Sequence, residues 1–427
     1  MARRLRDHDI SLHSPRYACS YLSGVLWRGW AVSMAECSTS DRLDGISACH
    51  LSTVHSAVDT RILYKEARSL ANAGCEVTVV ARLNGTRGYL EGVHVLGLPT
   101  KKSRLQRFSL LPRALQLALQ TRSDIYHLHD PELLLIAPAL WLLARRPIVY
   151  DVHEYYPEAI PAKEYIPRLL RRPAAFAYVV LERLVTPVLA GFIQPTPAQM
   201  ALCSWTQKPK ALVANYAWAD HYPEPDWSRP RPHVAVHTGS LTRSRAIGEM
   251  IRAMPQVVER FPDARLVLLG QPQSESYEQE LMALAKRSRV RKTVQFAGWV
   301  PFPQVRDTLY SASVGLSLLL PVADMKRCYP TKLFEYMAAG LPIVSDSLPH
   351  CRAIVEDAKC GLVVDAANPA AVAKAISYLF EHPEEAVEMG RRGRRAFLEK
   401  YAWEGEARKL VALYKRLLGD RRLTLPG

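Results

Sequence analysis

Short apolar runs alternate along the chain with longer segments in which apolar residues recur every three or four positions. The first series of runs occupies residues 46–52, 76–81, 93–98, 125–129, 147–153 and 191–196. Runs of this length between turn residues are typical of buried strands, and the segments between them have the period of amphipathic helices. Strands and helices that alternate in this way indicate a parallel sheet with helices on both faces.

A polar, proline-rich stretch at residues 217–233 (AWADHYPEPDWSRPRPH) interrupts this alternation and is the best linker in the chain. A second series of apolar runs follows: HVAVHTG, RLVLLG, VQFAGW, ASVGLSLLL, GLPIVSD and CGLVVD. We therefore predict an α/β protein with two doubly wound, Rossmann-like domains, at residues 46–220 and 221–403. Two such domains face each other across a cleft, and open sheets of this kind bind ligands at the carboxyl ends of their strands.

The composition narrows the class of protein and of partner. A length of 427 residues suits two domains, and 48% hydrophobic with 23% charged residues is typical of a globular chain. The formal net charge of +15 favours anionic partners, which are nucleic acid, phosphorylated small molecules or an anionic membrane surface. None of the eight cysteines forms a C-x-x-C pair, so neither a zinc site nor a disulfide framework is indicated. Four cysteines in apolar segments, as expected in a reducing cytoplasm, are Cys49, Cys75, Cys328 and Cys360.

No run in the sequence is long enough to cross a membrane. The longest uncharged apolar run, Leu133 to Ala144, contains a proline and is far shorter than the roughly 20 residues that a spanning helix needs. The basic N-terminus has an apolar stretch that Arg28 interrupts, so we interpret residues 1–45 as a poorly ordered extension and not as a signal peptide. Met34 is an alternative start.

Three strand ends in the second series carry residues suited to a nucleotide. Gly239 ends one run, and Arg243 and Arg245 come just before a helix, where backbone N–H groups and guanidinium groups suit phosphate oxygens. Trp299 and Val300 end another run, where a planar base can lie. Taken alone, the first feature has a solvated basic loop as its alternative, and the second has a packing tryptophan.

The stretch PTKLFEYMAAGLPIVSD supplies the third feature. Its helix begins near Lys332, and a lysine beside a helix N-terminus is suited to bind an anion. Glu335, one turn later, can accept hydrogen bonds from a ribose diol. A surface Lys–Glu pair is the alternative for these two residues. Sites for base, phosphate and ribose within one domain support each other, so we predict a nucleotide site that includes Lys332 and Glu335.

The second half resembles the nucleotide-binding domain of the retaining GT-B glycosyltransferases of family four. The matching pieces are GSLTRSRAI, RLVLLG, VQFAGWV, PTKLFEYMAAGLPIVSD and CGLVVD. In the first half, CHLSTVHSAVDTRILYKEARSLANAGCEVTVVA, DIYHLHDPELL and IVYDVHEYYPE are similar to the acceptor domain of polysaccharide-assembling members. The resemblance implies a donor domain at 221–403 and an acceptor domain at 46–220, onto which a C-terminal helix at 404–420 packs back.

The resemblance assigns roles in the donor domain and also shows departures from the family pattern. Glu335 matches the ribose-binding second Glu of an E-x7-E pattern, but Arg327 stands where the first Glu belongs. Arg245 matches a basic residue that grips the diphosphate, although Ala246 replaces the usual glycine. The family's other diphosphate-binding residue falls at Ser240, so we expect Arg243 to substitute for it.

In the acceptor domain, the resemblance places a histidine near the donor sugar and the reacting bond at His153, with Glu154 as the adjacent carboxylate. We expect His129 and Asp130, which end the preceding strand, to line the same cleft. Residues that follow the first strand and that we interpret as acceptor or phosphate contacts are His55, Asp59 and Arg61.

The implied reaction moves a sugar from a nucleoside-diphosphate sugar to a hydroxyl acceptor with retention of the anomeric configuration. Arg245 and Lys332 stabilise the leaving diphosphate, which also helps to deprotonate the acceptor. Because no strand end carries a D-x-D motif, we expect no metal and no other cofactor. Two alternatives remain: a nucleotide-sugar epimerase of the same fold, which needs no acceptor, and a non-enzymatic anion- or nucleic-acid-binding protein. Against the latter, no recognition helix is evident.

Two segments of the acceptor domain carry a net positive charge and have leucines at helical spacing. They are residues 101–122 and 168–184. One interpretation is a pair of solvated helices whose apolar faces form the core of the first domain. The other is a surface that binds anionic lipid. We expect the second, with the enzyme in the cytoplasm, peripheral at the inner face of the cytoplasmic membrane, in cell-envelope or exopolysaccharide assembly. A lipid-linked glycan is one candidate acceptor.

Overall fold

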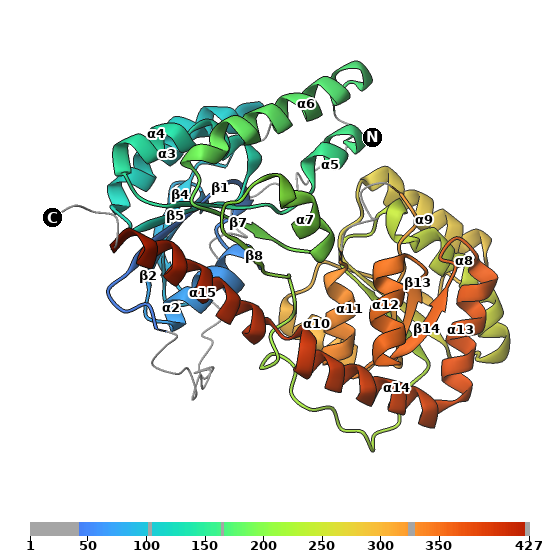
Figure 1. Cartoon of the computed structure of the whole chain (residues 1–427). Coiled ribbons are helices and arrows are strands. Elements are labelled where there is room, and N and C mark those ends of the chain that lie inside the picture. The colour runs from blue at the N-terminus through green and yellow to red at the C-terminus, as the bar shows by residue number, and fades with distance from the viewer. Residues whose placement is uncertain (1–41, 101–104, 164–165, 323–328, 423–427) are drawn as a thin grey trace, which may run out of the picture. The chain divides into compact units, whose positions relative to one another are not determined.

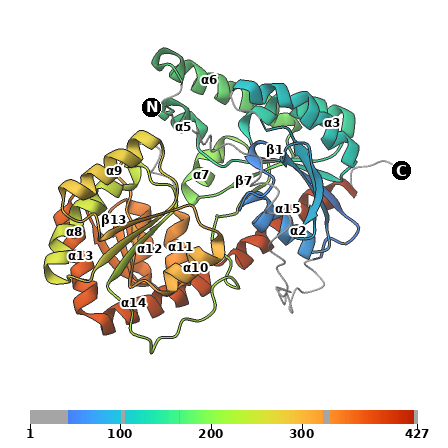
Figure 2. The same cartoon turned by 180° about the vertical axis from the view of Figure 1, so that it is seen from behind.

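The computed structural model describes residues 42–100, 105–163, 166–322 and 329–422. The predictions made for the N-terminal extension, for Arg327 and for Cys328 lie outside these residues. Within them, the chain forms two α/β domains, each with one central sheet and helices on both faces (Figures 1 and 2).

The first sheet has eight strands in the order β3-β4-β2-β1-β5-β6-β7-β8. Their bounds are β1 (Ser47–Ser56), β2 (Glu76–Arg82), β3 (Arg87–Leu90), β4 (Val93–Leu98), β5 (Ile125–Leu128), β6 (Ile148–Asp151), β7 (Gly191–Gln194) and β8 (Lys210–Leu212). All neighbouring strands pair in parallel except β3 and β4, which pair antiparallel at the edge.

Two apolar clusters cover the two faces of this sheet, because successive residues of a strand point to opposite sides. Ala48, Ile125 and Val149 face one cluster, while Leu51, Leu128 and Tyr150 face the other. The first face is covered by the π-helical turn η2 (Ile62–Ala67), α2 (Arg68–Asn72) and α15 (Trp403–Arg422). The second face is covered mainly by η3 (Leu105–Leu110), α3 (Leu111–Thr121), η4 (Pro131–Leu135), α4 (Ala137–Ala144) and α6 (Arg168–Val185).

Shorter helices of the first domain are α5 (Tyr156–Ala162), η5 (Thr186–Val188), α7 (Pro197–Leu202) and η6 (Cys203–Trp205).

Helix α15 belongs to this domain by its packing, although it comes last in the chain. Trp403 is fully buried there, and its Nε1 donates to Ser69 Oγ at 2.9 Å. Glu406 Oε2 accepts a hydrogen bond from the backbone N–H of Ala214, which follows β8, at 2.8 Å.

The second sheet has six parallel strands in the order β11-β10-β9-β12-β13-β14. Their bounds are β9 (Val234–Thr238), β10 (Arg265–Leu269), β11 (Val294–Gly298), β12 (Val314–Ser317), β13 (Ile343–Asp346) and β14 (Gly361–Val364). The helices are η7 (Arg243–Arg245), α8 (Ile247–Arg260), α9 (Glu275–Arg287), α10 (Phe302–Tyr310), α11 (Thr331–Ala338), α12 (Pro349–Ala358), α13 (Pro369–Glu381), α14 (Pro383–Ala396) and η9 (Phe397–Tyr401).

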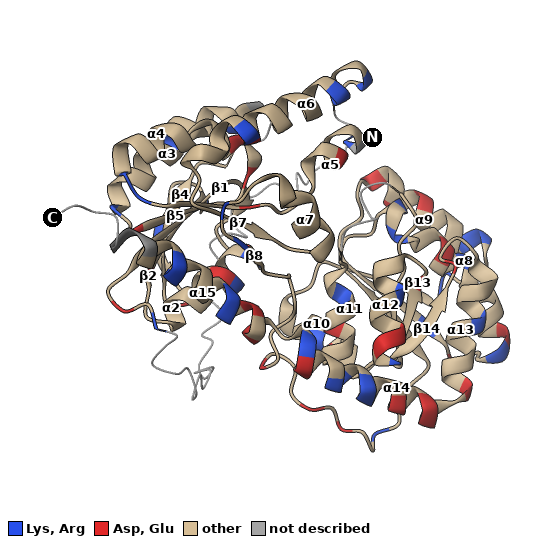
Figure 3. Ribbon diagram, in the orientation of Figure 1, with Lys and Arg blue, Asp and Glu red and all other residues tan. Residues whose placement is uncertain are grey.

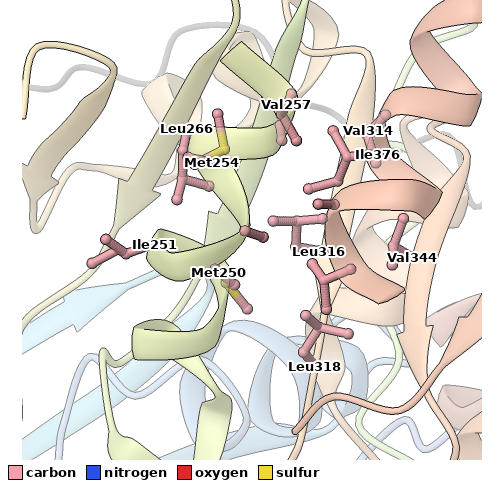
Figure 4. Close-up of a cluster of buried hydrophobic side chains, with 14 of the residues drawn as sticks. Met250, Ile251, Met254, Val257, Leu266, Val314, Leu316, Leu318, Val344 and Ile376 are labelled. Atoms are coloured by element: carbon pink, nitrogen blue, oxygen red, sulfur yellow. The ribbon is translucent and has the colours of Figure 1, made fainter. Parts of the chain in front are cut away.

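Figure 4 shows one core of this second domain, in which side chains of α8 and α13 meet those of the strands. Met250, Met254 and Val257 come from one face of α8, at the three- and four-residue spacing of an amphipathic helix. They pack with Leu316 and the other buried members of the cluster. Burial of this apolar surface is the main force that holds the helix on the sheet.

Every strand predicted from the apolar runs is present, and the α/β fold class is confirmed. Two edge strands, β3 and β8, escaped prediction because they are short and not buried. The expectation of purely parallel pairing was wrong for β3. The cysteines at positions 49, 75 and 360 are buried and free. Of the helices in the described ranges, none is long and apolar enough to cross a membrane.

Candidate active site

The carboxyl ends of β1, β5 and β6 meet at one edge of the first sheet, where four predicted site residues lie: His55, His129, Asp130 and His153. Asp130 ties this edge together. Its Oδ2 accepts hydrogen bonds from Ser52 Oγ at 2.8 Å and from the backbone N–H groups of Thr53 at 2.6 Å and Val54 at 3.0 Å. A buried carboxylate with several donors stabilises the end of β1 in one conformation.

His55 and Asp59 form a second pair at this edge, with Nδ1 and Oδ2 2.9 Å apart. Asp59 Oδ1 also accepts from the backbone N–H of Arg61 at 2.8 Å and of Ile62 at 3.0 Å, so it caps the turn that starts η2. Burial lowers the pKa of His55, but Asp59 and Asp130 outweigh it, and the pKa is raised. Burial raises the pKa of Asp59, but His55 and the two N–H groups hold it well below its usual range.

Arg61 lies behind the edge, buried in the domain. Its Nε and Nη2 donate to the two oxygens of Asp151, at 3.0 and 3.1 Å, and its Nη1 donates to the carbonyl of Val213 at 3.1 Å. Nε is also 2.8 Å from Glu66 Oε1. The structure thus places Arg61 as a support for Asp151, and with a residue exposure of only 6% it has little surface for the predicted contact with an acceptor or phosphate.

His153 follows β6 and keeps part of its ring exposed. Its Nε2 lies 3.0 Å from Asp151 Oδ2 and 3.2 Å from His129 Nδ1. Burial would raise the pKa of Asp151, but Arg61 and the two histidines hold it well below the usual range. Burial lowers the pKa of His129 to about 4. His153 therefore stands in front of an ionised carboxylate and a neutral imidazole, with its Nδ1 on the other side of the ring.

Glu154, the carboxylate next to His153, points to a different partner. Lys163 Nζ donates to Glu154 Oε2 at 2.6 Å, and both side chains are substantially exposed. The structure therefore does not bring Glu154 into the hydrogen-bond network of His153.

In the second domain, three predicted residues converge at the end of β9. Gly239 has φ +98°, and a Cβ atom added there would lie 2.8 Å from Arg245 Nη1 and 3.8 Å from Lys332 Nζ. Arg245 Nη1 donates to the carbonyl of Ser240 at 3.2 Å, and Lys332 is almost fully buried in the first turn of α11. Two cations that flank a glycine backbone, which has no side chain to block approach, form a site suited to phosphate oxygens.

Glu335 lies one turn after Lys332 on α11 and is partly exposed. Thr238 Oγ1 donates to Glu335 Oε2 at 3.4 Å, and the backbone N–H of Thr238 donates to the Tyr336 hydroxyl at 3.0 Å. Burial raises the pKa of Glu335 against the opposing effect of nearby lysine charges. The carboxylate is thus close to the end of β9, as a ribose contact beside the phosphate position requires.

The remaining donor-domain predictions are less closely grouped. Arg243 is exposed and forms a bidentate pair with Glu280, with its guanidinium 4.7 Å from the Tyr277 ring. It is therefore engaged with α9 and is not among the groups that flank Gly239. Trp299 and Val300 follow β11, and Trp299 is more than half exposed.

Models of two known families match the chain, one on each domain. The model described as "Glycosyl transferases group 1" matches residues 232–382, and the model described as "Glycosyl transferase 4-like domain" matches residues 60–214. Together they cover most of both domains. The chain is a family four glycosyltransferase of the GT-B fold. The two Rossmann-like domains predicted from the sequence are those of this fold.

Two relatives illustrate the family. A D-inositol 3-phosphate glycosyltransferase of Corynebacterium urealyticum is 27% identical over 43% of this chain, and the match spans only 43% of that enzyme's length. A phosphatidyl-myo-inositol mannosyltransferase of Mycobacterium tuberculosis is 23% identical over 70% of this chain and 75% of its own. Both are glycosyltransferases by name.

Two solved structures share the fold. Sucrose-phosphate synthase of Thermosynechococcus elongatus has a TM-score of 0.71 and 17% identity over 88% of this chain and 100% of its own. HepE of Anabaena, solved in complex with UDP-glucose, has a TM-score of 0.64 and 14% identity over 87% of this chain and 100% of its own. At these identities the likeness establishes the fold of this glycosyltransferase and not its substrate.

Sequence reasoning missed a group of buried polar residues behind His153 in this glycosyltransferase. The group comprises His50, Glu66, His127, Asp151 and Tyr414. The signal in the sequence was the position of His50 and His127 inside apolar strands and of His129 directly after the second of them. Their partners come from other elements, and the tyrosine comes from α15.

Donor atoms of His50, Glu66, His127 and His129 all lie within 4.8 Å of one another, as do those of His129, Asp151 and His153. However, most of these ring nitrogens already bond to each other or to Tyr414, and the Arg61 guanidinium contacts both carboxylates. A fixed positive charge beside the carboxylates opposes a divalent cation.

Proposed function

We propose that this glycosyltransferase moves a sugar from a nucleoside-diphosphate sugar to a hydroxyl acceptor, with retention of the anomeric configuration. We propose cell-envelope or exopolysaccharide glycan assembly as its setting. The observation that carries the proposal is the convergence of Arg245 and Lys332 on Gly239, with Glu335 one turn away. This grouping fits a diphosphate next to a ribose diol, and the bound UDP-glucose of the structurally similar HepE is a ligand of that class.

Negative charge develops on the leaving diphosphate as the bond to the sugar breaks. Groups that are already aimed at that charge lower the barrier most, because they need not reorganise during the reaction. Arg245 and Lys332 supply two such charges, and Lys332 acts from a buried position where water screens it little. These two cations are the reason that we propose a reaction without a bound metal.

The acceptor lies, in this proposal, at the edge of the first sheet that carries His153. In this proposal the partly exposed ring of His153 lies near the donor sugar and the reacting bond, as the resemblance to the family implies. Asp130 and Asp59, the nearby carboxylates, are held by backbone N–H groups, and Asp151 is held by Arg61. Because these carboxylates already accept hydrogen bonds from other groups, none of them is well placed to act as a covalent nucleophile. We therefore favour a front-face displacement over a covalent glycosyl-enzyme intermediate.

The test is donor turnover by the purified protein against a panel of UDP- and GDP-sugars, followed by mass spectrometry. Lys332→Met should lower turnover of the preferred donor about 100-fold, because it removes one of the two cations at the diphosphate. Lys286→Met, which changes an exposed lysine on α9, is the control and should have no effect. Conversion of the donor to another sugar without any acceptor would identify an epimerase instead. Activity in the presence of a chelator tests metal independence.

The first domain also exposes apolar side chains on α4 and α6 that do not take part in its core. On α6, Leu169, Phe176 and Leu184 are exposed by 91%, 71% and 73%. On α4, which covers the same face of the sheet, three further residues are exposed: Trp141, Leu142 and Leu143. Exposed arginines of α6 are Arg168, Arg172 and Arg183, and Figure 3 shows basic positions along this helix. Apolar side chains next to arginines suit an anionic membrane surface.

We therefore propose that α4 and α6 bind anionic lipid from the cytoplasmic side, which brings a lipid-linked acceptor to His153. Vesicle co-sedimentation tests this. Binding should need anionic lipid and should fall as salt is raised, because each arginine contributes only about 1 kcal/mol through a screened interaction. The double variant Leu169→Ser and Phe176→Ser should lose binding, whereas Leu398→Ser, at an exposed leucine of the second domain, should keep it. Equal binding to neutral vesicles would contradict the proposal.

A further inference from the structure

A pocket lies at the carboxyl ends of β6 and β7, on the face of the first sheet that α6 covers. Its walls come from the segment after β6, from α6, and from α7 with η6. The space between these walls, with its open mouth included, measures about 280 Å³. Val152, the residue before His153, is part of the wall. The pocket therefore adjoins the edge of the sheet at which we place the acceptor.

Aromatic side chains form a large part of the pocket wall. They are Tyr155, Tyr156, Tyr178 and Trp205. Tyr156 packs on Tyr178 with ring centroids 5.0 Å apart, and Phe192 supports Trp205 at 5.9 Å. The guanidinium group of Arg183 lies over the Trp205 ring, 5.8 Å from its centroid, and Trp205 is 37% exposed. Aromatic rings beside a few polar groups are the usual lining of a site for a small organic ligand.

Gln199 supplies a polar atom of the pocket that lacks a partner. The residue is only 6% exposed, and within the described residues its buried Oε1 accepts no hydrogen bond. Thr196 Oγ1 accepts from the backbone N–H of Gln199 at 3.2 Å, which fixes the first turn of α7 that carries this amide. A buried amide oxygen without a donor is costly, so a ligand that donates to it gains affinity. A hydroxyl group both donates and accepts, so it satisfies the amide in either of its two orientations.

The charges of the pocket decide which class of ligand fits. Of the described residues, those that line the pocket include no lysine, arginine or histidine. Glu182 contributes a carboxyl group, whose Oε1 accepts from the Tyr178 hydroxyl at 2.8 Å and whose second oxygen can accept from a ligand. Lys210 Nζ, close by, donates to the carbonyls of Cys203 and Thr206 at 3.1 and 2.6 Å. A phosphate in the pocket would thus meet a carboxyl group and no lining cation, whereas an uncharged group that bears hydroxyls finds acceptors.

We propose that this pocket is a subsite for one uncharged sugar residue of the acceptor, an inference that rests on the proposed transferase function. The C–H face of the sugar lies against the aromatic side chains, one hydroxyl donates to Gln199 Oε1, and another donates to Glu182. Pockets for small molecules usually measure about 300–1,000 Å³, so this one holds at most a single sugar residue, and any longer glycan extends out of the mouth. Gln199 and Glu182 select the acceptor and take no part in the bond that forms.

Saturation-transfer NMR on the full chain, without any donor, tests the subsite directly. The probes are the methyl α-glycosides of glucose, galactose, mannose and N-acetylglucosamine. At least one should bind, inorganic phosphate should not displace it, and Gln199→Leu should weaken its binding about tenfold or more, because the hydrogen bond to the sugar is lost. Gln120→Leu, the same change at an exposed glutamine of α3 in the same domain, is the matched control and should bind as the parent does. Trp205→Ala, at a partly exposed position, is a second variant that should lose binding.

A thermal melt of the free protein separates a binding role of Gln199 from a structural one. Gln199→Leu removes a buried oxygen that has no partner among the described residues, so the midpoint of unfolding should not fall. A clear fall would show that the amide is needed to hold the fold and would overturn the subsite. Binding of no glycoside, equal binding by the parent and Gln199→Leu, or displacement by phosphate would overturn it as well.

Turnover assays distinguish a failure of the subsite from a failure of the proposed function. With a glycoside that accepts sugar, Gln199→Leu should raise the KM for the acceptor about tenfold and leave the KM for the donor unchanged. Transfer with the same acceptor KM in the parent and in Gln199→Leu would reject the subsite and keep the transferase. Glycoside binding that depends on Gln199, without transfer from any nucleotide sugar, would keep the sugar site and reject the transferase.

Discussion

The Nε2 atom of His153 lies 3.0 Å from Oδ2 of Asp151, a carboxylate with no exposed surface. Arg61 grips the same carboxylate with Nε and Nη2, so its position is fixed from behind. An ionised carboxylate only accepts hydrogen bonds, and the histidine must therefore present Nε2–H to it. This contact leaves Nδ1 as the ring nitrogen that does not face Asp151.

Asp151→Asn should lower the free energy of unfolding by about 3 kcal/mol, because it leaves the buried Arg61 without its main partner. We expect the lower end of the range for a broken buried pair, since Glu66 Oε1 is also 2.8 Å from Arg61 Nε. Glu154→Gln breaks the exposed pair with Lys163 and should cost less than about 1 kcal/mol. Urea denaturation measures both. Equal losses would show that Asp151 does not anchor Arg61.

Glu335→Ala should weaken binding of the cognate nucleotide about tenfold to a hundredfold, because a charged hydrogen-bond acceptor for the ribose is lost. The carboxylate is partly exposed and receives one long hydrogen bond from Thr238, so the midpoint of thermal unfolding should change little. Calorimetric titration and a thermal melt of the same sample separate the two effects. Unchanged affinity would exclude Glu335 from the nucleotide site.

Gly239→Ala should reduce affinity for the donor. The new Cβ would lie 2.8 Å from Arg245 Nη1, and the backbone φ of +98° is strained for alanine, at a cost of about 1–3 kcal/mol. Gly405→Ala is the control, since a Cβ there meets no atom within 4 Å. Donor affinity by calorimetry should be unchanged in the control. A normal affinity in Gly239→Ala would place the diphosphate elsewhere.

The His55–Asp59 pair should make stability depend on pH. The pKa of folded His55 is raised above its ordinary value of 6.5, so its contribution is fully present below about pH 6.5 and is lost as pH rises through the folded pKa. The contribution should be under about 1 kcal/mol because both side chains are partly exposed. The difference in unfolding free energy between the parent and Asp59→Asn should shrink from about pH 6 to about pH 9. A difference that grows over this range would contradict the assignment.

The sequence was sufficient for the α/β fold class and for all strands except β3 and β8. Buried strands such as β9 and β10 are continuous apolar runs, and their order along the chain follows from parallel pairing with helical connections. The three residues that we propose for the nucleotide site, Gly239, Lys332 and Glu335, could be nominated from the sequence because each stands at a strand end or in a first helical turn, which are local features. The edge strand β3 had no such signal, since its residues are mostly exposed.

Tertiary structure alone decided which polar residues act together. Arg61 looked like a ligand contact in the sequence, but Asp151, 90 residues later, holds it in the core. Tyr414 bonds to His127 across 287 residues and to His50 across 364, because α15 returns to cover the first sheet. Apolar periodicity reports which face of an element is buried. It carries no information about which distant donor and acceptor meet there, since that depends on how the elements pack.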